Sequence, residues 1–244
     1  MTLADANIVV IDVETAVSAD DCRHCGQALQ AHYADGACTS WTGEKPADDV
    51  RQFTALGWRN PPALGLSIGA YWDYQDMRIH WVDGVTLEAT VLDWVTRAPL
   101  MVSFNGLEFD FLLLEGLLRQ HAETLPSPDP GRALVADLCD QFHALCATSY
   151  DVLAAIWRVD PARKFERGLT SLDALSRANG LGGKLSHGAQ APRDWRAGRI
   201  ADVLNYCQDD VLKTKALFEL VLAQGSLLRG DGLPLALPAP EVIA

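Results

Sequence analysis

The chain of 244 residues is 49% hydrophobic and 21% charged, which suits one substantial domain with a buried core and excludes wholesale disorder. It does not open with a basic region followed by an apolar run, and no stretch of about eighteen apolar residues could cross a bilayer. We therefore expect a cytoplasmic protein that does not interact with a membrane.

The formal net charge of −12 argues against a polyanionic partner unless bound cations or a local basic patch reverse the sign. Such a patch exists in the sequence, because residues 158–199 contain nine lysines and arginines and only four acids. This segment is a candidate surface for phosphate groups. A solvated basic loop is the alternative interpretation.

The first predicted element is a buried strand over residues 7–15, a run of β-branched residues that ends in two acids. Side chains alternate along a strand, so Asp12 and Glu14 point to the same side. Adjacent carboxylates on an apolar strand repel each other, and their removal from water is unfavourable. Mg²⁺ or Mn²⁺ would relieve both effects, because hard cations prefer oxygen ligands. The alternative is a strand end that reaches solvent.

Residues 16–62 are predicted to form an insertion within the domain rather than a domain of their own. The insertion is polar and contains the pattern Cys-x2-Cys-x6-His-x5-Cys. Clustered cysteines in a cytosolic chain favour a metal over disulfides, and four such ligands complete a structural zinc site. The predicted ligands are Cys22, Cys25, His32 and Cys38, with His24 as an alternative to His32. A loop with reduced thiols is the other interpretation.

The sequence next predicts two strands joined by a tight turn, over residues 63–74 and 77–82, which form an antiparallel meander with the first strand. Apolar periodicity predicts a helix over residues 86–97. Another short apolar run predicts a buried strand over residues 100–104.

A polar turn that begins at Asn105 follows this strand, and a helix is predicted to open near Glu108. Asp110 then falls in the first helical turn, where the helix dipole favours a negative charge. Helix stability alone would also explain an acid at this position.

The rest of the chain is predicted to be mainly helical. The predicted elements are a short strand over 133–135 with a helix after it, helices over 151–158, 170–179 and 199–223, and an irregular Pro-rich tail over 230–244. Tyr206 and Asp210 are four residues apart on the last helix, and hence lie on one face. The alternative interpretation is that Tyr206 and Asp210 form a hydrogen bond with a purely structural role.

Three motifs thus occur in order: Asp-x-Glu at a strand end, Asn-x-x-x-Phe-Asp after a second strand, and Tyr-x-x-x-Asp on a late helix. They resemble the DEDD superfamily of 3′→5′ exonucleases, and among these the branch that includes the proofreading domains of family-B DNA polymerases and stand-alone relatives. Another branch has a histidine five residues before the last aspartate, where this chain has Asn205. The resemblance covers residues 7–15 and 63–224.

The resemblance implies an α/β fold with a ribonuclease H-like mixed five-stranded sheet flanked by helices, in a single domain over residues 1–244. It also implies hydrolysis of a nucleic acid, with DNA favoured, from its 3′ end to nucleoside 5′-monophosphates by a two-metal mechanism. Asp12 would bridge two Mg²⁺ or Mn²⁺ ions. Glu14 and Asp210 would complete one site, and Asp110 would serve the other. Tyr206 would orient the attacking water, since a phenol with a pKa near 10 is a poor base.

The implied partner is a nucleic acid with a free 3′ end, with single-stranded DNA favoured. Thr15 and Asn105 would lie beside the terminal nucleotide, and Trp195 is a candidate stacking surface. The candidate phosphate contacts, taken from the basic segment, are Arg163, Lys164, Arg167, Arg193 and Arg196.

Two functions of other classes remain open from the sequence. One is a catalytically silent module that binds nucleic acid ends, and the other is an adaptor that recruits a partner through its zinc site. A metal-dependent assay on labelled single strands separates the first from a nuclease. Deletion of residues 18–60 separates the second, because an adaptor would lose its partner and keep any turnover.

Overall fold

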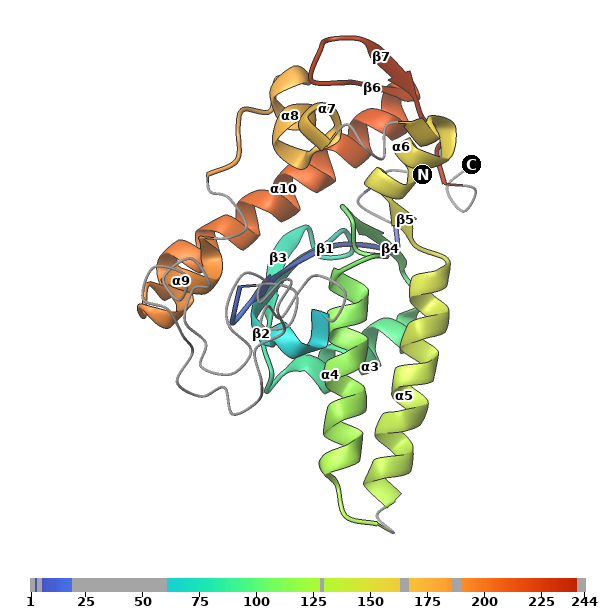
Figure 1. Cartoon of the computed structure of the whole chain (residues 1–244). Coiled ribbons are helices and arrows are strands. Elements are labelled where there is room, and N and C mark those ends of the chain that lie inside the picture. Colours follow the sequence, from blue (N-terminus) through green and yellow to red (C-terminus); the bar gives the residue numbers. More distant parts are fainter. Residues whose placement is uncertain are drawn as a thin grey trace, which may run out of the picture.

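The computed structural model describes residue 3 and residues 6–18, 61–127, 130–162, 167–185 and 190–240. A five-stranded sheet with the order β3-β2-β1-β4-β5 lies at its centre (Figure 1). Strand β1 pairs antiparallel with β2 and parallel with β4, so the sheet is mixed. The strands are β1 Ile8–Thr15, β2 Leu66–Asp73, β3 Arg78–Val82, β4 Leu100–Ser103 and β5 Tyr150–Asp151. The predicted mixed five-stranded sheet flanked by helices is confirmed, and it is consistent with a ribonuclease H-like fold.

Helices cover both faces of this sheet (Figure 1). The helical elements are η2 Pro61–Leu64, α3 Leu87–Arg97, α4 Asp110–Thr124, α5 Pro130–Ala147, α6 Val152–Val159, α7 Arg167–Thr170, α8 Leu172–Ala178, α9 Ala191–Arg196 and α10 Ile200–Gln224. Within the described residues, none of them has both the length and the apolar character needed to cross a bilayer.

Strand β1 is buried on both faces, and the alternation of its side chains decides where its acids point. Val9, Ile11 and Val13 belong to one core with residues of α3, α4 and α5. Ile8 and Val10 belong to the other core, which contains residues of α10. Asp12 and Glu14 continue the second series and therefore lie on the side of α10.

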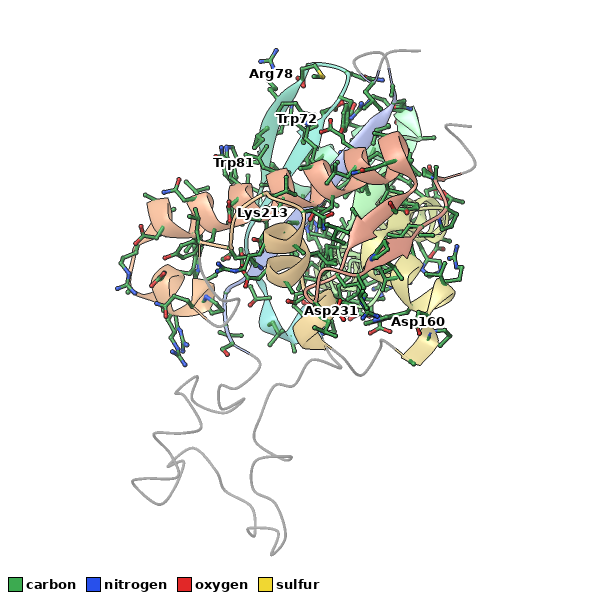
Figure 2. All side chains as sticks on the ribbon, turned by 90° about the horizontal axis from the view of Figure 1, so that it is seen from above. Trp72, Arg78, Trp81, Asp160, Lys213 and Asp231 are labelled. Atoms are coloured by element: carbon green, nitrogen blue, oxygen red, sulfur yellow. The ribbon has the colours of Figure 1, made fainter. Side chains whose placement is uncertain are left out.

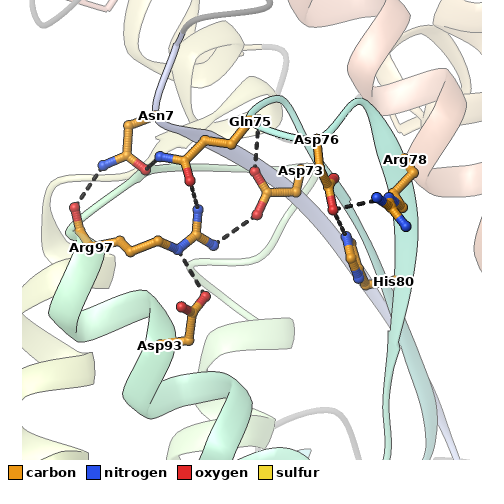
Figure 3. Close-up of polar contacts among 8 residues, drawn as sticks. All are labelled: Asn7, Asp73, Gln75, Asp76, Arg78, His80, Asp93 and Arg97. Carbon is orange, nitrogen blue, oxygen red and sulfur yellow. Dashed lines mark hydrogen bonds and ion pairs between the residues drawn. The ribbon is translucent and has the colours of Figure 1, made fainter.

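A network of polar side chains lies at the start of β1, at the opposite end of the strand from these acids (Figure 3). The guanidinium of Arg97 donates to Asp73 (2.8 Å), Asp93 (2.8 Å) and Gln75 (3.0 Å). Asn7 donates to the carbonyl oxygen of Arg97 (2.6 Å) and accepts from Gln75 (3.2 Å). The end of α3 is thus fixed to β2 and to the start of β1 by hydrogen bonds and ion pairs.

The predicted strand over residues 133–135 is wrong, because these residues lie inside α5. Val135, Leu138 and Phe142 are buried at helical spacing, with Leu138 and Phe142 in the core shared with α3 and α4. A three-residue apolar run fits either periodicity, and the neighbouring helices decide between them.

The predicted irregular tail is also wrong in part. Residues Pro234–Ala236 form β7, which pairs antiparallel with β6 (Ser226–Leu228). Leu235 and Leu237 are buried against the core that contains α10. Burial of these leucines explains why a Pro-rich segment adopts regular structure here.

Candidate metal centre and active site

Three carboxylates from two distant parts of the chain meet at the end of β1. Asp12, Glu14 and Asp210 each offer an oxygen, and these oxygens all lie within 4.8 Å of one another. Glu14 is 8% exposed and Asp210 is 6% exposed. The structure therefore brings together three of the four acids that the motifs singled out.

Packing between α10 and the sheet sets this meeting point. Cys207 and Val211 are fully buried against Ala70 of β2, the residue that pairs with Asp12 in the sheet. The thiol of Cys207 also donates to the carbonyl oxygen of Asp12 (3.3 Å). Asp210 lies between these two contacts on α10, and its carboxylate therefore reaches the acids of β1.

Asp110, the fourth acid, adjoins the cluster from the first turn of α4. Its Oδ1 accepts a hydrogen bond from the backbone N–H of Val13 (3.0 Å), the residue between Asp12 and Glu14. Asp110 is 4% exposed, and its charge raises the pKa of Asp12. It is thus placed beside the three-acid group, although no oxygen of Asp110 belongs to that group.

Burial and mutual repulsion make all four carboxylates hard to ionise. Burial first, and the charge of Asp210 second, raise the pKa of Glu14 to about 8. Burial raises the pKa of Asp110 to about 7, helped by the charge of Asp151. The pKa values of Asp12 and Asp210 are raised as well, chiefly by burial. A group of three buried acids and the half-buried Asp12, with these properties, fits divalent cations, which would remove the repulsion.

One lysine enters the cluster. The ammonium of Lys184 forms an ion pair with Oδ2 of Asp210, and only 23% of the lysine side chain is exposed. Burial alone would lower the pKa of Lys184, but the charges of Asp210 and Asp12 outweigh burial and raise it. Lys184 belongs to the basic segment of residues 158–199 and is not among the residues that the sequence analysis assigned to the site.

A further buried acid, Asp151, shapes the turn that leads to Asp110. Its carboxylate accepts from the backbone N–H groups of Asn105 (3.1 Å) and Leu107 (3.1 Å) and from the hydroxyl of Ser103 (3.2 Å). Asn105 has φ +72°, a left-handed conformation that asparagine tolerates better than most residues. Asp151 thereby fixes the backbone at Asn105.

The sequence contained a partial signal for Asp151. The residue opens the helix predicted over residues 151–158, and in the structure it caps α6 by accepting from the N–H of Ala154 (2.9 Å). An acid before an apolar helix is typical of a cap. Its three contacts to the end of β4 and the turn that follows connect residues 44 to 48 positions apart, and no local pattern indicates them.

The remaining predicted residues lie around this centre or outside the described residues. Thr15 ends β1 and is buried, and the half-buried Tyr206 lies one turn before Asp210 on α10. Helix α9 packs beside α10 and carries the half-buried Trp195 and the exposed Arg193 and Arg196. Outside the described residues are Arg163 and Lys164, the side chain of Arg167, and the candidate zinc ligands Cys22, Cys25, His32, Cys38 and His24.

Clustered carboxylates can hold divalent cations, and pairs of bound metal ions serve in phosphatases, polymerases and nucleases. Residues 148–230 match the sequence model of a family described as a predicted 3'-5' exonuclease related to the exonuclease domain of PolB. This match confirms the resemblance to that group of exonucleases. No curated protein and no solved structure matches the chain.

The family match and the geometry support each other, because they depend on different residues. The matched segment contains Asp151, Lys184, Tyr206 and Asp210, but neither acid of β1. The structure places Asp12 and Glu14 beside Asp210. The fold thus brings the two acids of β1, which lie outside the matched segment, beside an acid within it.

Proposed function

We propose that this protein is a metal-dependent 3′→5′ exonuclease that hydrolyses nucleic acid, with DNA favoured, to nucleoside 5′-monophosphates. The observation that carries the proposal is the convergence of carboxylate oxygens of Asp12, Glu14 and Asp210 within 4.8 Å, in a chain whose residues 148–230 match a predicted exonuclease family. An acidic chain remains compatible with this substrate, because bound cations reverse the charge at the site where the strand ends.

The four acids would hold two Mg²⁺ or Mn²⁺ ions, with Asp12 bridging them. Glu14 and Asp210 would complete one site, and Asp110 would serve the second, partly through water. Such ions would activate the attacking water and stabilise charge on the leaving 3′ oxygen. The hydrogen bond from Val13 already orients one oxygen of Asp110, which leaves the other oxygen for this role.

The other residues would bind and orient the substrate. Tyr206 would hold the attacking water without removing its proton, since an ordinary phenol stays protonated at neutral pH. Thr15 and Asn105 would contact the terminal nucleotide. Thr15 follows Glu14 on β1, and Asn105 lies in the turn that leads from β4 to Asp110. Trp195 would stack on a base, and Arg163, Lys164, Arg167, Arg193 and Arg196 would contact phosphates.

A digestion experiment tests this function. Single-stranded DNA labelled at its 5′ end, the same strand blocked at its 3′ end, and RNA of the same sequence are each incubated with Mg²⁺, Mn²⁺ or EDTA. We expect a ladder of shortened strands and released 5′-monophosphates from the unblocked DNA only when metal is present. Degradation of the 3′-blocked strand, or an undiminished rate in EDTA, would contradict the proposal, and binding without cleavage would favour the silent module.

Two variants on one helix provide the matched control. Asp210→Asn removes an acid of the centre, whereas Asp202→Asn changes a half-exposed acid two turns earlier on α10. We expect the first variant to lose cleavage and the second to retain it. Equal activity of the two variants would exclude Asp210 from the site.

We also propose a structural zinc site in the insertion, with Cys22, Cys25, His32 and Cys38 as ligands. Its support is the spacing of these residues, together with the position of the segment that contains them. The backbone N–H groups of Ala16 and Val17 donate to Gly65 and Leu64 (3.0 Å each), so the two flanks of the insertion lie side by side. Metal analysis of protein purified without chelator tests the site, and less than about half an equivalent of zinc would count against it.

A further inference from the structure

The segment between α8 and α9 that carries Lys184 into the metal centre is held in place by acids of two helices. We call residues 180–185 the lysine arm. Gly180 and Gly182 have φ +77° and +78°, conformations that residues with side chains rarely adopt. These glycines let the arm turn sharply from the end of α8 back toward the acids at the end of β1.

Two consecutive backbone amides of the arm are bound by carboxylates. The N–H of Lys184 donates to Oδ1 of Asp173 in the first turn of α8 (2.7 Å), and the N–H of Leu185 donates to Oδ2 of Asp209 on α10 (3.1 Å). Arg177 donates to both oxygens of Asp173 (3.0 and 3.1 Å), and the buried Lys213 forms an ion pair with Asp209.

The two helices that supply these acids pack against each other, so both acids that bind the lysine arm belong to one packed pair of helices. Helix α8 contacts α10, and Figure 2 shows α8 beside the part of α10 that carries Lys213. The adjacent residues Asp209 and Asp210 consequently act on the same arm in different ways. Asp209 holds its backbone, and Asp210 binds the ammonium of Lys184.

An ammonium fixed among carboxylates has two opposite effects. It lowers the repulsion among Asp12, Glu14 and Asp210, and it repels any divalent cation that approaches the same oxygens. The second effect depends on how firmly the arm holds Lys184, because a released lysine would turn its ammonium toward water.

We infer that Lys184 lowers the affinity of the carboxylate centre for divalent ions, and that Asp173 and Asp209 are positioning residues that keep its ammonium there. This inference rests on the proposed function only for the identity of the ions that the acids bind. It concerns ion binding, which is measured without substrate, so its outcome is separate from that of the digestion experiment.

The test is a titration of the full chain with Mn²⁺ at fixed pH and ionic strength, in which free Mn²⁺ is read by electron paramagnetic resonance. We expect Lys184→Gln to lower the Kd for Mn²⁺ about tenfold, and Asp173→Ala to lower it about threefold by loosening the arm. In the Lys184→Gln background, Asp173→Ala should leave the Kd unchanged. Asp202→Asn, which changes an acid outside the arm and the centre, should leave it unchanged in the natural chain.

Three results would overturn the inference. They are an equal or higher Kd in Lys184→Gln, the same effect of Asp173→Ala in both backgrounds, and no Mn²⁺ binding by either the natural chain or Lys184→Gln.

Circular dichroism in EDTA establishes that each variant folds. Asp173→Ala keeps Lys184 in the chain, so its effect on the Kd still decides the matter if Lys184→Gln does not fold. If the protein is an active exonuclease and the Kd for Mn²⁺ is the same in the natural chain, Lys184→Gln and Asp173→Ala, the inference is refuted and the proposed function stands.

Discussion

Replacing Glu14 by glutamine should stabilise the metal-free protein at high pH. Burial and the charge of Asp210 raise the pKa of Glu14 from 4.5 to about 8 in the folded chain. A carboxyl group with a raised pKa leaves stability intact below its ordinary value of 4.5 and lowers stability as pH rises through about 8. Glutamine has a similar shape and no charge, so the variant avoids this loss.

The size of the effect follows from the shift in pKa. Each pH unit between the two pKa values changes the free energy of unfolding by up to ~1.4 kcal/mol, which gives about 4 kcal/mol from pH 5 to pH 8 as a ceiling. The neighbouring acids keep part of the repulsion, so we expect Glu14→Gln to be more stable than the natural chain by about 2 kcal/mol at pH 8. That difference corresponds to a Tm higher by about 4–8 °C for a chain of this length.

Thermal unfolding in EDTA at pH 5, 6, 7 and 8 measures this effect, with Glu123→Gln as the matched control at an exposed position. The advantage of Glu14→Gln should grow with pH, and the control should show no such trend. Saturating Mg²⁺ should reverse the order at pH 8, because the natural carboxylate then binds an ion that glutamine binds poorly. An advantage of Glu14→Gln that is absent at pH 8, or equal at pH 5 and pH 8, would refute the reasoning.

Three further predictions concern activity and stability. Asp12→Asn should lower kcat by about a thousandfold and leave the chain folded, as judged by initial rates and circular dichroism; near-normal turnover would remove Asp12 from the centre. Tyr206→Phe should lower kcat only about tenfold with little change in the Kd for Mn²⁺, and a complete loss of turnover would assign a larger role to the phenol. Asp151→Asn should lower the free energy of unfolding by about 2 kcal/mol, because it weakens four hydrogen bonds to one buried carboxylate; an unchanged denaturant midpoint would contradict this.

The parts of the site that the sequence predicted follow from short-range periodicity. Alternation along β1 placed Asp12 and Glu14 on one face, and their oxygens do lie together with that of Asp210. The helical spacing of Tyr206 and Asp210 likewise needs only one element. The alignment of β1 with α10 could be inferred only through the resemblance, because the acids of the two elements are nearly 200 positions apart.

The parts that the sequence did not predict depend on contacts between distant segments. The position of the lysine arm depends on hydrogen bonds to acids of both α8 and α10, and the role of Asp151 requires the turn after β4 to fold against β5. The hairpin of β6 and β7 is stabilised by burial of Leu227 and Leu235 against the core, which a Pro-rich stretch does not reveal. In each case tertiary packing decides a structure that local propensity leaves open.

Crystals grown with Mn²⁺ and a nucleoside 5′-monophosphate would test the metal centre most directly, through anomalous scattering from the manganese. We predict manganese peaks bound by carboxylate oxygens of Asp12, Glu14 and Asp210, at about 2.1–2.2 Å, with the phosphate of the nucleotide on the same ions. Manganese bound only at other surfaces, with these three carboxylates left without an ion, would contradict the assignment of a two-metal nuclease centre.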